Sequence, residues 1–225
     1  MSTEEQELTP FFDVHQRATV EAAMARIIPT DDTPGAREAR TIDFLEGYLS
    51  GIERIYAKPD GSGFEVLDGK QAHAWERRVD LIREKYVTGL AELDRRSRER
   101  CGADFVNLTE PQQDEMLRAL EGSGTDQPEG TDSPLSINYG GPVEPALQQT
   151  NAEADLDFFP LLVQHTRQGF YADPVYGGNA DRVGWQVIGF PGPGSLAEVH
   201  DGRYSTIDWF AENRTHPGTG SDDDA

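Results

Sequence analysis

The sequence predicts a mainly α fold: a small helical domain of about five helices, with long irregular loops and an extended glycine- and aromatic-rich C-terminal arm. Three observations indicate this fold. Apolar residues recur at steps of three and four in successive segments, the period of a helix with one buried face. Capping residues followed by proline mark helix starts. Two stretches, 122–154 and 169–194, are rich in residues that bend a chain. At 225 residues the chain is long enough to bury a sizeable core.

These patterns divide the chain into five regions. They are a flexible N-terminus (1–8), a helical domain (9–121), an acidic Gly/Pro-rich linker or surface loop (122–154), a helix with the docking arm of the same domain (155–210) and a disordered tail (211–225).

The first two helices are predicted to form a pair. The first begins at Thr9, as N-cap before Pro10, and ends at Ile28 because Pro29 follows. Its buried positions are Val20, Ala23, Met24, Ile27 and Ile28. The second begins with the same cap-then-proline signal at Thr33, and its stripe is Ile42, Leu45, Leu49 and Ile52.

The clearest helix is expected at about 71–100, after a loop at 57–70 in which Phe64, Val66 and Leu67 form a short extended piece. Its apolar stripe is Ala72, Trp75, Val79, Ile82, Tyr86, Leu90 and Leu93. Nine of the chain's 20 basic residues lie on its outer face. Two interpretations of that face stay open: a solvated surface with ion pairs along the helix, or a docking surface for an acidic partner.

Two further helices complete the domain. A capping box of Thr109 and Gln112 begins the fourth helix, whose buried residues are Met116, Leu117 and Leu120. The fifth is predicted at about 155–168, with Gly169 ending it, and its inward residues are Phe158, Phe159, Leu162 and Val163.

Charge and composition exclude several kinds of partner. The net charge of −21, from 41 acidic and 20 basic residues, argues against nucleic acid and against anionic membrane surfaces. No window is apolar enough to cross a bilayer, so no direct membrane insertion is expected. The acidic N-terminus lacks a secretory or twin-arginine signal, which predicts a cytoplasmic protein unless a partner carries an export signal.

The sequence predicts no catalytic, cofactor-binding or metal site on this chain. The single cysteine, Cys101, is interpreted as an ordinary thiol. No histidine has a second ligand at the spacing of a known metal signature, and no nucleophile lies in a recognisable elbow. Gly184 and Gly189 have P-loop spacing but lack the Lys and Ser or Thr that must follow. His165 faces either the core, as a hydrogen-bonding residue, or the loop after it.

The stretch GFYADPVYGGNADRVGWQVIGFPGPG (169–194) is predicted to be a repeatedly turning arm that binds a partner. It holds seven glycines, five aromatic residues and three prolines. Aromatic residues are enriched at the energetic centres of protein interfaces. The predicted contact residues are Phe170, Tyr171, Pro174, Tyr176, Gly177, Gly178, Asn179, Trp185 and Phe190. Packing of the same residues onto the helical core is the alternative, and the two are compatible on different faces of one loop.

Three stretches together resemble the gluconate 2-dehydrogenase subunit 3 family: residues 11–49, 104–121 and about 156–192. The most specific parts are IIPTDDTPGA and DPVYGGNADRVGWQVIGFPG. The resemblance implies a small, mainly helical, noncatalytic subunit that binds a large flavoprotein of the glucose-methanol-choline (GMC) class. It implies FAD and the catalytic histidines on that large chain, oxidation of sugars, sugar acids or glycosides, and in some members a multihaem cytochrome c subunit.

The chain departs from the family pattern in lacking a twin-arginine signal and in the length of the acidic segment. Two other functions stay open from the sequence. The chain could bind carbohydrate or act as an enzyme alone, with the aromatics of 169–194 stacking on a sugar. It could also be a maturation factor that releases the flavoprotein once FAD is bound.

Overall fold

The computed structural model describes residues 9–121 and 153–204. Over these ranges the chain forms helices, and strand-type pairing is limited to one isolated antiparallel bridge between Ala57 and Phe64, which agrees with the short extended piece expected there. The helices are α1 (Val14–Ile27), α2 (Thr41–Ser50), α3 (Gly69–Cys101), α4 (Glu110–Glu121), α6 (Phe158–Tyr171), α7 (Val183–Val187) and α8 (Leu196–His200). Short 3-10 turns are η1 (Phe105–Asn107), η2 (Pro174–Tyr176) and η3 (Ala180–Arg182). The mainly α prediction is confirmed.

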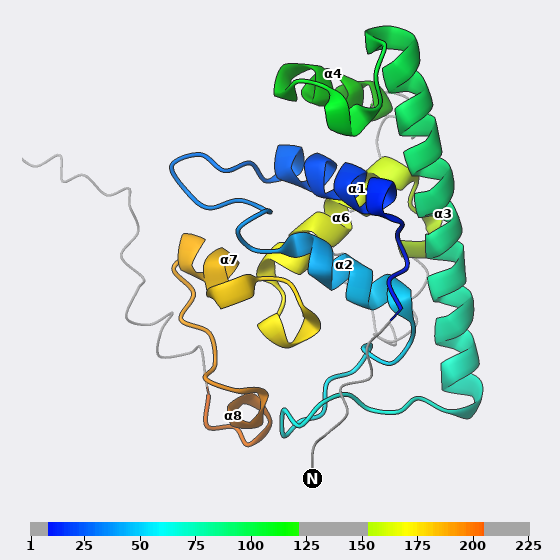
Figure 1. Cartoon of the computed structure of the whole chain (residues 1–225). Helices are drawn as coiled ribbons and strands as arrows, with labels where there is room; N and C mark the ends of the chain where they lie inside the picture. The colour runs from blue at the N-terminus through cyan, green and yellow to red at the C-terminus, as the bar shows by residue number, and fades with distance from the viewer. Residues whose placement is uncertain (1–8, 122–152, 205–225) are drawn as a thin grey trace, which may run out of the picture.

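The long helix α3 runs along one side of the molecule, and α4 lies across one of its ends (Figure 1). Helices α1, α2 and α6 lie beside α3, and α7 and α8 lie on the side away from it. The predicted flexible N-terminus (1–8), the disordered tail (211–225) and all but the last two residues of the acidic segment lie outside the described residues.

Helix α1 begins four residues later than the cap-then-proline signal predicts. Asp13, and not Thr9, is the N-cap: its side chain accepts a hydrogen bond from the Gln16 amide at 2.8 Å, and the Gln16 side chain accepts one from the Asp13 amide at 3.2 Å. This reciprocal capping box satisfies two backbone donors at once. The residues before it are not helical, and a bend at Phe11 and Phe12 precedes the cap. Phe12 is buried, and its amide donates to Glu46 at 3.2 Å.

Replacing Asp13 by alanine is expected to destabilise the protein by about 1 kcal/mol, because the α1 N-terminus loses its cap. Thr9→Ala is the control and should change the free energy of unfolding by less than about 0.5 kcal/mol, since Thr9 lies outside the helix and is exposed. Urea unfolding of both variants measures this. A larger loss in Thr9→Ala than in Asp13→Ala would contradict the assignment.

Helix α2 also starts later than predicted, at Thr41 and not after Thr33. Gly35 lies against the end of α1: a Cβ there would be 2.5 Å from the Ile28 carbonyl oxygen, and the Ala36 amide donates to that oxygen at 2.9 Å. The chain therefore turns back on α1 before it becomes helical, and it reaches Thr41 through Arg40 at a φ of 51°. The predicted pairing of the first two helices is confirmed, because both contribute to one core.

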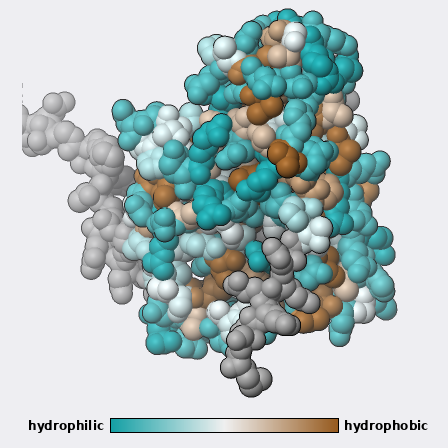
Figure 2. Space-filling model, viewed as in Figure 1, coloured by the Kyte–Doolittle hydropathy of each residue, from teal (hydrophilic) through white to brown (hydrophobic). Residues whose placement is uncertain are grey.

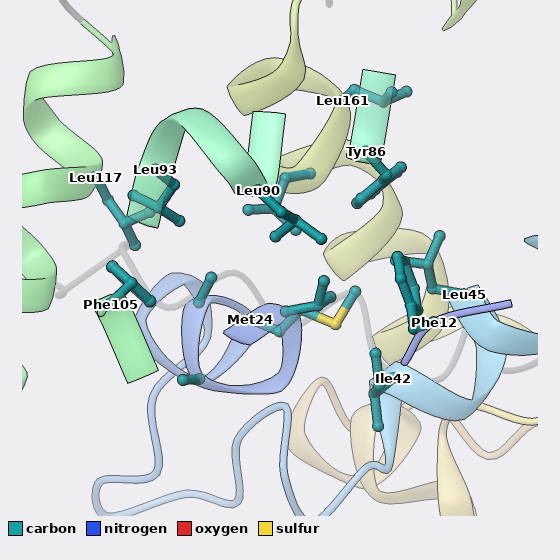
Figure 3. Packing of buried hydrophobic residues seen from close by; sticks show 14 of the residues in the cluster. Phe12, Met24, Ile42, Leu45, Tyr86, Leu90, Leu93, Phe105, Leu117 and Leu161 are labelled. Atoms are coloured by element: carbon teal, nitrogen blue, oxygen red, sulfur yellow. The ribbon is translucent and has the colours of Figure 1, made fainter. Parts of the chain in front are cut away.

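The core lies where α1, α2, α3 and α6 meet, and Figure 3 shows side chains from these helices converging there. The predicted stripe of α3 is buried except for Trp75, which is half-buried. Gly89 on α3 leaves the space that the Phe158 ring fills. At Thr109 one half of the predicted capping box is observed: the Gln112 side chain accepts from the Thr109 amide at 3.0 Å, and it also accepts from the Thr109 hydroxyl at 2.9 Å.

The outer face of α3 forms ion pairs along the helix. Arg95 contacts Glu92 at 2.7 Å and Glu99 at 2.5 Å, and Arg83 contacts Asp80 at 3.0 Å. These pairs favour the solvated-surface interpretation over a docking surface for an acidic partner. Because these pairs lie at the solvent-accessible surface, they add little to stability.

Helix α6 is shifted toward the C-terminus relative to the prediction, and Gly169 lies within it. A Cβ on Gly169 would be 2.8 Å from the Thr41 Cγ2 atom, so the glycine serves close packing of α6 on α2 and does not end the helix. Among the expected inward residues Leu162 is buried, whereas Phe158, Phe159 and Val163 are half-buried.

Candidate partner-binding arm

Residues 169–194, the arm predicted from the sequence, begin in the last turn of α6 and cross the ends of α6 and α2. They bring together two stretches that lie far apart in the sequence. The Ala180 amide donates to the Ala39 carbonyl at 3.0 Å, so the arm touches the turn before α2. Gly178 lies against the backbone of Gly169, where a Cβ would overlap it. Gly177, at a φ of 100°, lies against the Asp43 carbonyl. These glycines are needed for the close approach of two backbones.

Asn179 holds the arm together from inside. Its side chain is fully buried, donates to the Ala172 carbonyl at 2.8 Å and accepts from the Gly184 amide at 2.8 Å. The residue thereby joins the end of α6 to the start of α7. Its φ of 48° is one that asparagine tolerates better than most residues.

The turn after Asn179 is strained. Asp181 and Arg182 have φ values of 53° and 60°, which non-glycine residues rarely adopt. Arg182 donates to the Gly194 carbonyl at 3.2 Å and lies 5.8 Å from the centre of the Trp185 ring. Strained backbone of this kind persists only where surrounding contacts hold it, and it is concentrated at functional sites.

The aromatic residues of the arm are mostly turned inward. Phe170 is buried, Trp185 is 6% exposed, and the Trp185 indole donates to the Tyr171 carbonyl at 2.8 Å. Phe190 packs edge-on against Trp185 at 5.3 Å. Tyr176 accepts from the Ala57 amide at 3.3 Å. The core-packing alternative therefore accounts for most of these side chains.

Among the predicted contact residues, only Tyr171 is exposed, at 42%. The structure buries Phe170, Gly178, Asn179 and Trp185, as the core-packing alternative expects. Pro174, Tyr176, Gly177 and Phe190 are half-buried, and binding of these residues to a partner stays a prediction. Sequence reasoning missed two exposed apolar side chains at the end of α7, Val187 and Ile188. On the face that Figure 2 shows, hydrophobic residues reach the surface in small groups among hydrophilic ones.

A carboxylate, an imidazole and a hydroxyl meet in the core. His165 is fully buried and contacts Glu153 through Nε2 and the Tyr86 hydroxyl through Nδ1, the latter at 2.8 Å. Burial raises the pKa of Tyr86 well above its usual value, so its hydroxyl stays protonated. This arrangement supports packing and not nucleophilic chemistry, and the core interpretation of His165 is the one observed.

One group of three side chains in residues 9–121 and 153–204 has metal-ligand chemistry: His15, Asp94 and Asp104. His15 Nε2 lies 2.6 Å from an Asp94 carboxylate oxygen, the other oxygen accepts the Phe105 amide at 2.9 Å, and Asp104 pairs with Arg98. These contacts join α1, α3 and η1. An open surface pocket of about 280 Å³ between α3 and α4 lies away from the arm.

Comparison with known proteins identifies the family. The family model for gluconate 2-dehydrogenase subunit 3 matches residues 14–192, from the first residue of α1 through α7 and nearly all of the arm. No curated protein and no solved structure gives a match. None of the helices in the described ranges has the length and apolar character needed to span a membrane. The chain belongs to the gluconate 2-dehydrogenase subunit 3 family.

Proposed function

We propose that this chain is the noncatalytic small subunit of a dehydrogenase complex, and that it binds and stabilises a large FAD-dependent subunit of the GMC class. The observation that carries the proposal is the family match, which spans the helical core and the arm together. The family is named for the third subunit of a dehydrogenase, so its members act within an assembly. Sugars, sugar acids or glycosides are the proposed substrates of the complex, and a cytochrome c subunit is a further proposed partner.

The proposed mechanism is stabilisation by mass action. A chain that binds only the folded large subunit raises that subunit's stability by RT ln(1 + [L]/Kd), where [L] is the free concentration of the small subunit and Kd is the dissociation constant. Tight binding therefore favours folding and FAD retention without any chemistry on the small subunit. FAD is expected on the large subunit.

The proposed contact surface is the exposed part of the arm and its neighbours. Tyr171 at the end of α6 and Val187 and Ile188 at the end of α7 are exposed apolar side chains, and the strained turn at Asp181 and Arg182 directly precedes α7. Exposed apolar side chains rimmed by polar groups are typical of interface centres. Trp185 supports this surface from beneath, through its hydrogen bond to Tyr171.

Coexpression of the chain with the large flavoprotein subunit tests the proposal. We expect a yellow complex, and we expect Tyr171→Ala together with Ile188→Ala to weaken it by about 2 kcal/mol, or roughly 30-fold in Kd. Leu81→Ala is the matched control, because Leu81 is an exposed apolar residue on the outer face of α3. Equal affinity of the arm variant and the control would remove this surface from the interface.

Burial of the arm aromatics argues against the stand-alone carbohydrate-binding alternative. Stacking on a sugar needs an exposed ring face, and Phe170 and Trp185 are covered by their own chain. A titration of the isolated chain with gluconate or glucosides, followed by tryptophan fluorescence, is expected to give no saturable response. A saturable response at millimolar ligand would favour carbohydrate binding instead.

A further inference from the structure

A single buried carboxylate joins three helices of the core. Glu153, just before α6, is 3% exposed and is contacted by Arg78 from α3, His165 from α6 and Tyr48 from α2. Arg78 donates to one carboxylate oxygen, to which the Tyr48 hydroxyl also donates at 3.4 Å, and His165 contacts the other oxygen. The contacts to Arg78 and Tyr48 are separated by 75 and 105 positions along the chain.

The hydrogen bonds determine where the proton of His165 lies. An ionised carboxylate can only accept, so His165 Nε2 donates to Glu153, and Nδ1 of the neutral ring accepts from the Tyr86 hydroxyl. Burial, and then the charge of Arg78, lower the pKa of His165 to about 3, which agrees with a neutral ring. The charges in this network are then one guanidinium and one carboxylate, which balance.

Arg78 requires a carboxylate at this position. Its side chain is 12% exposed, its guanidinium lies 4.8 Å from the centre of the Trp75 ring, and its Nε atom has no hydrogen-bond partner among the described residues. A buried guanidinium without a counter-charge is strongly unfavourable. Arg78, His165 and Tyr48 therefore surround the position of one carboxylate group. Arg78 supplies a positive charge there, and His165 and Tyr48 supply two further hydrogen-bond donors.

We propose that Arg78, His165 and Tyr48 form a carboxylate-binding site that Glu153 occupies as an internal ligand. The contacts of Glu153 hold the segment before α6 against α2 and α3, and we call this set of contacts the latch. Since α6 carries Phe170 and leads directly into the arm, the latch also holds the arm in position. The proposal is independent of the proposed function, because it concerns contacts within the isolated chain.

Small free carboxylates test the site directly. Glu153→Ala is expected to lower the melting temperature of the full chain by about 10 °C, because Arg78 loses its counter-charge. Sodium acetate or propionate should then raise the melting temperature of this variant in a saturable manner, beyond the effect of sodium chloride at equal ionic strength. The wild type and Glu92→Ala, which removes an exposed acid paired with Arg95, should show no such difference between acetate and chloride. Equal effects of acetate and chloride on Glu153→Ala would overturn the proposal.

A second variant applies if Glu153→Ala fails to fold. Glu153→Gln keeps the volume and one acceptor oxygen but removes the charge. Backbone amide hydrogen exchange of this variant is expected to be faster in α6 and the arm than in the wild type, with little change in α4. Unchanged exchange in α6 and the arm would show that Glu153 is not a latch, and so would a uniform increase over all helices.

Discussion

Replacing Gly184 by alanine is expected to destabilise the protein by about 3 kcal/mol or more, and to release the arm from α6. A Cβ at this position would overlap the Phe170 carbonyl oxygen. Because that atom belongs to the backbone of α6, it cannot rotate away as a side chain could. Moving α7 outward would also lengthen the hydrogen bond from the Gly184 amide to Asn179, which is 2.8 Å in the structure.

Gly47→Ala provides the matched control for this prediction. Gly47 lies inside α2 and is buried, but the nearest atom to an added Cβ is 3.7 Å away, at Arg54 Cδ. The same change there should be neutral or stabilising by up to about 1 kcal/mol, because alanine favours a helix more than glycine does. Urea unfolding followed by tryptophan emission measures both variants, and similar free energies of unfolding for the two would contradict the close contact at Gly184.

The contrast between the helices shows what a sequence determines. Helix α3 was predictable from its long apolar stripe, and α4 from the pairing of Thr109 with Gln112 before an apolar face. The starts of α1 and α2 were not, since Thr9 and Thr33 carry the same cap-then-proline signal but neither begins a helix. At α1 the capping box of Asp13 and Gln16, which the prediction from sequence did not include, begins the helix instead. At α2 the deciding contact, of Gly35 with the end of α1, exists only in three dimensions.

In the arm, too, contacts between distant segments of the chain could not be predicted from the sequence. The many glycines correctly predicted a chain that bends repeatedly, but not that Gly169, Gly178 and Gly184 each bring two backbones into contact. That contact buries Phe170 and Trp185, and residue type alone left core packing and partner docking of these side chains open. Glu153 was missed altogether. It lies in an acidic stretch, and nothing in its neighbours distinguishes a buried acid from a solvated one.

Replacing Asp94 by alanine is expected to cost about 2–3 kcal/mol, because the change leaves the buried Phe105 amide without its acceptor. The variant Asp94→Asn separates the loss of the acceptor for the Phe105 amide from the loss of the negative charge beside His15. The asparagine can still accept from the Phe105 amide but cannot pair with a protonated His15. We therefore expect Asp94→Asn to retain most of the stability that Asp94→Ala loses, as measured by urea unfolding at one pH.

The contact between His15 and Asp94 also predicts how the free energy of unfolding changes with pH, including the sign of the change. The hydrogen bond that His15 donates to Asp94, aided by the charges of Asp94, Asp104 and Asp13, raises the pKa of His15 above its model-peptide value of 6.5. A raised pKa means that the folded state binds the proton more tightly. The stabilisation is therefore fully present below about pH 6.5 and is lost as pH rises through the folded-state pKa. Its size should stay below about 1 kcal/mol, because the His15 side chain is 45% exposed.

Urea unfolding of the wild type, Asp94→Asn and His15→Gln between pH 5.5 and 9 tests this sign. The stability difference between the wild type and either variant should shrink as pH rises, since above its pKa His15 is neutral in the wild type and in Asp94→Asn, and His15→Gln carries no titrating group at this position. The remaining difference for Asp94→Asn then reports the neutral hydrogen bonds alone. A difference that grows with pH would mean that His15 is held neutral beside Asp94, and that the contact between α1 and α3 is an ordinary hydrogen bond and not an ion pair.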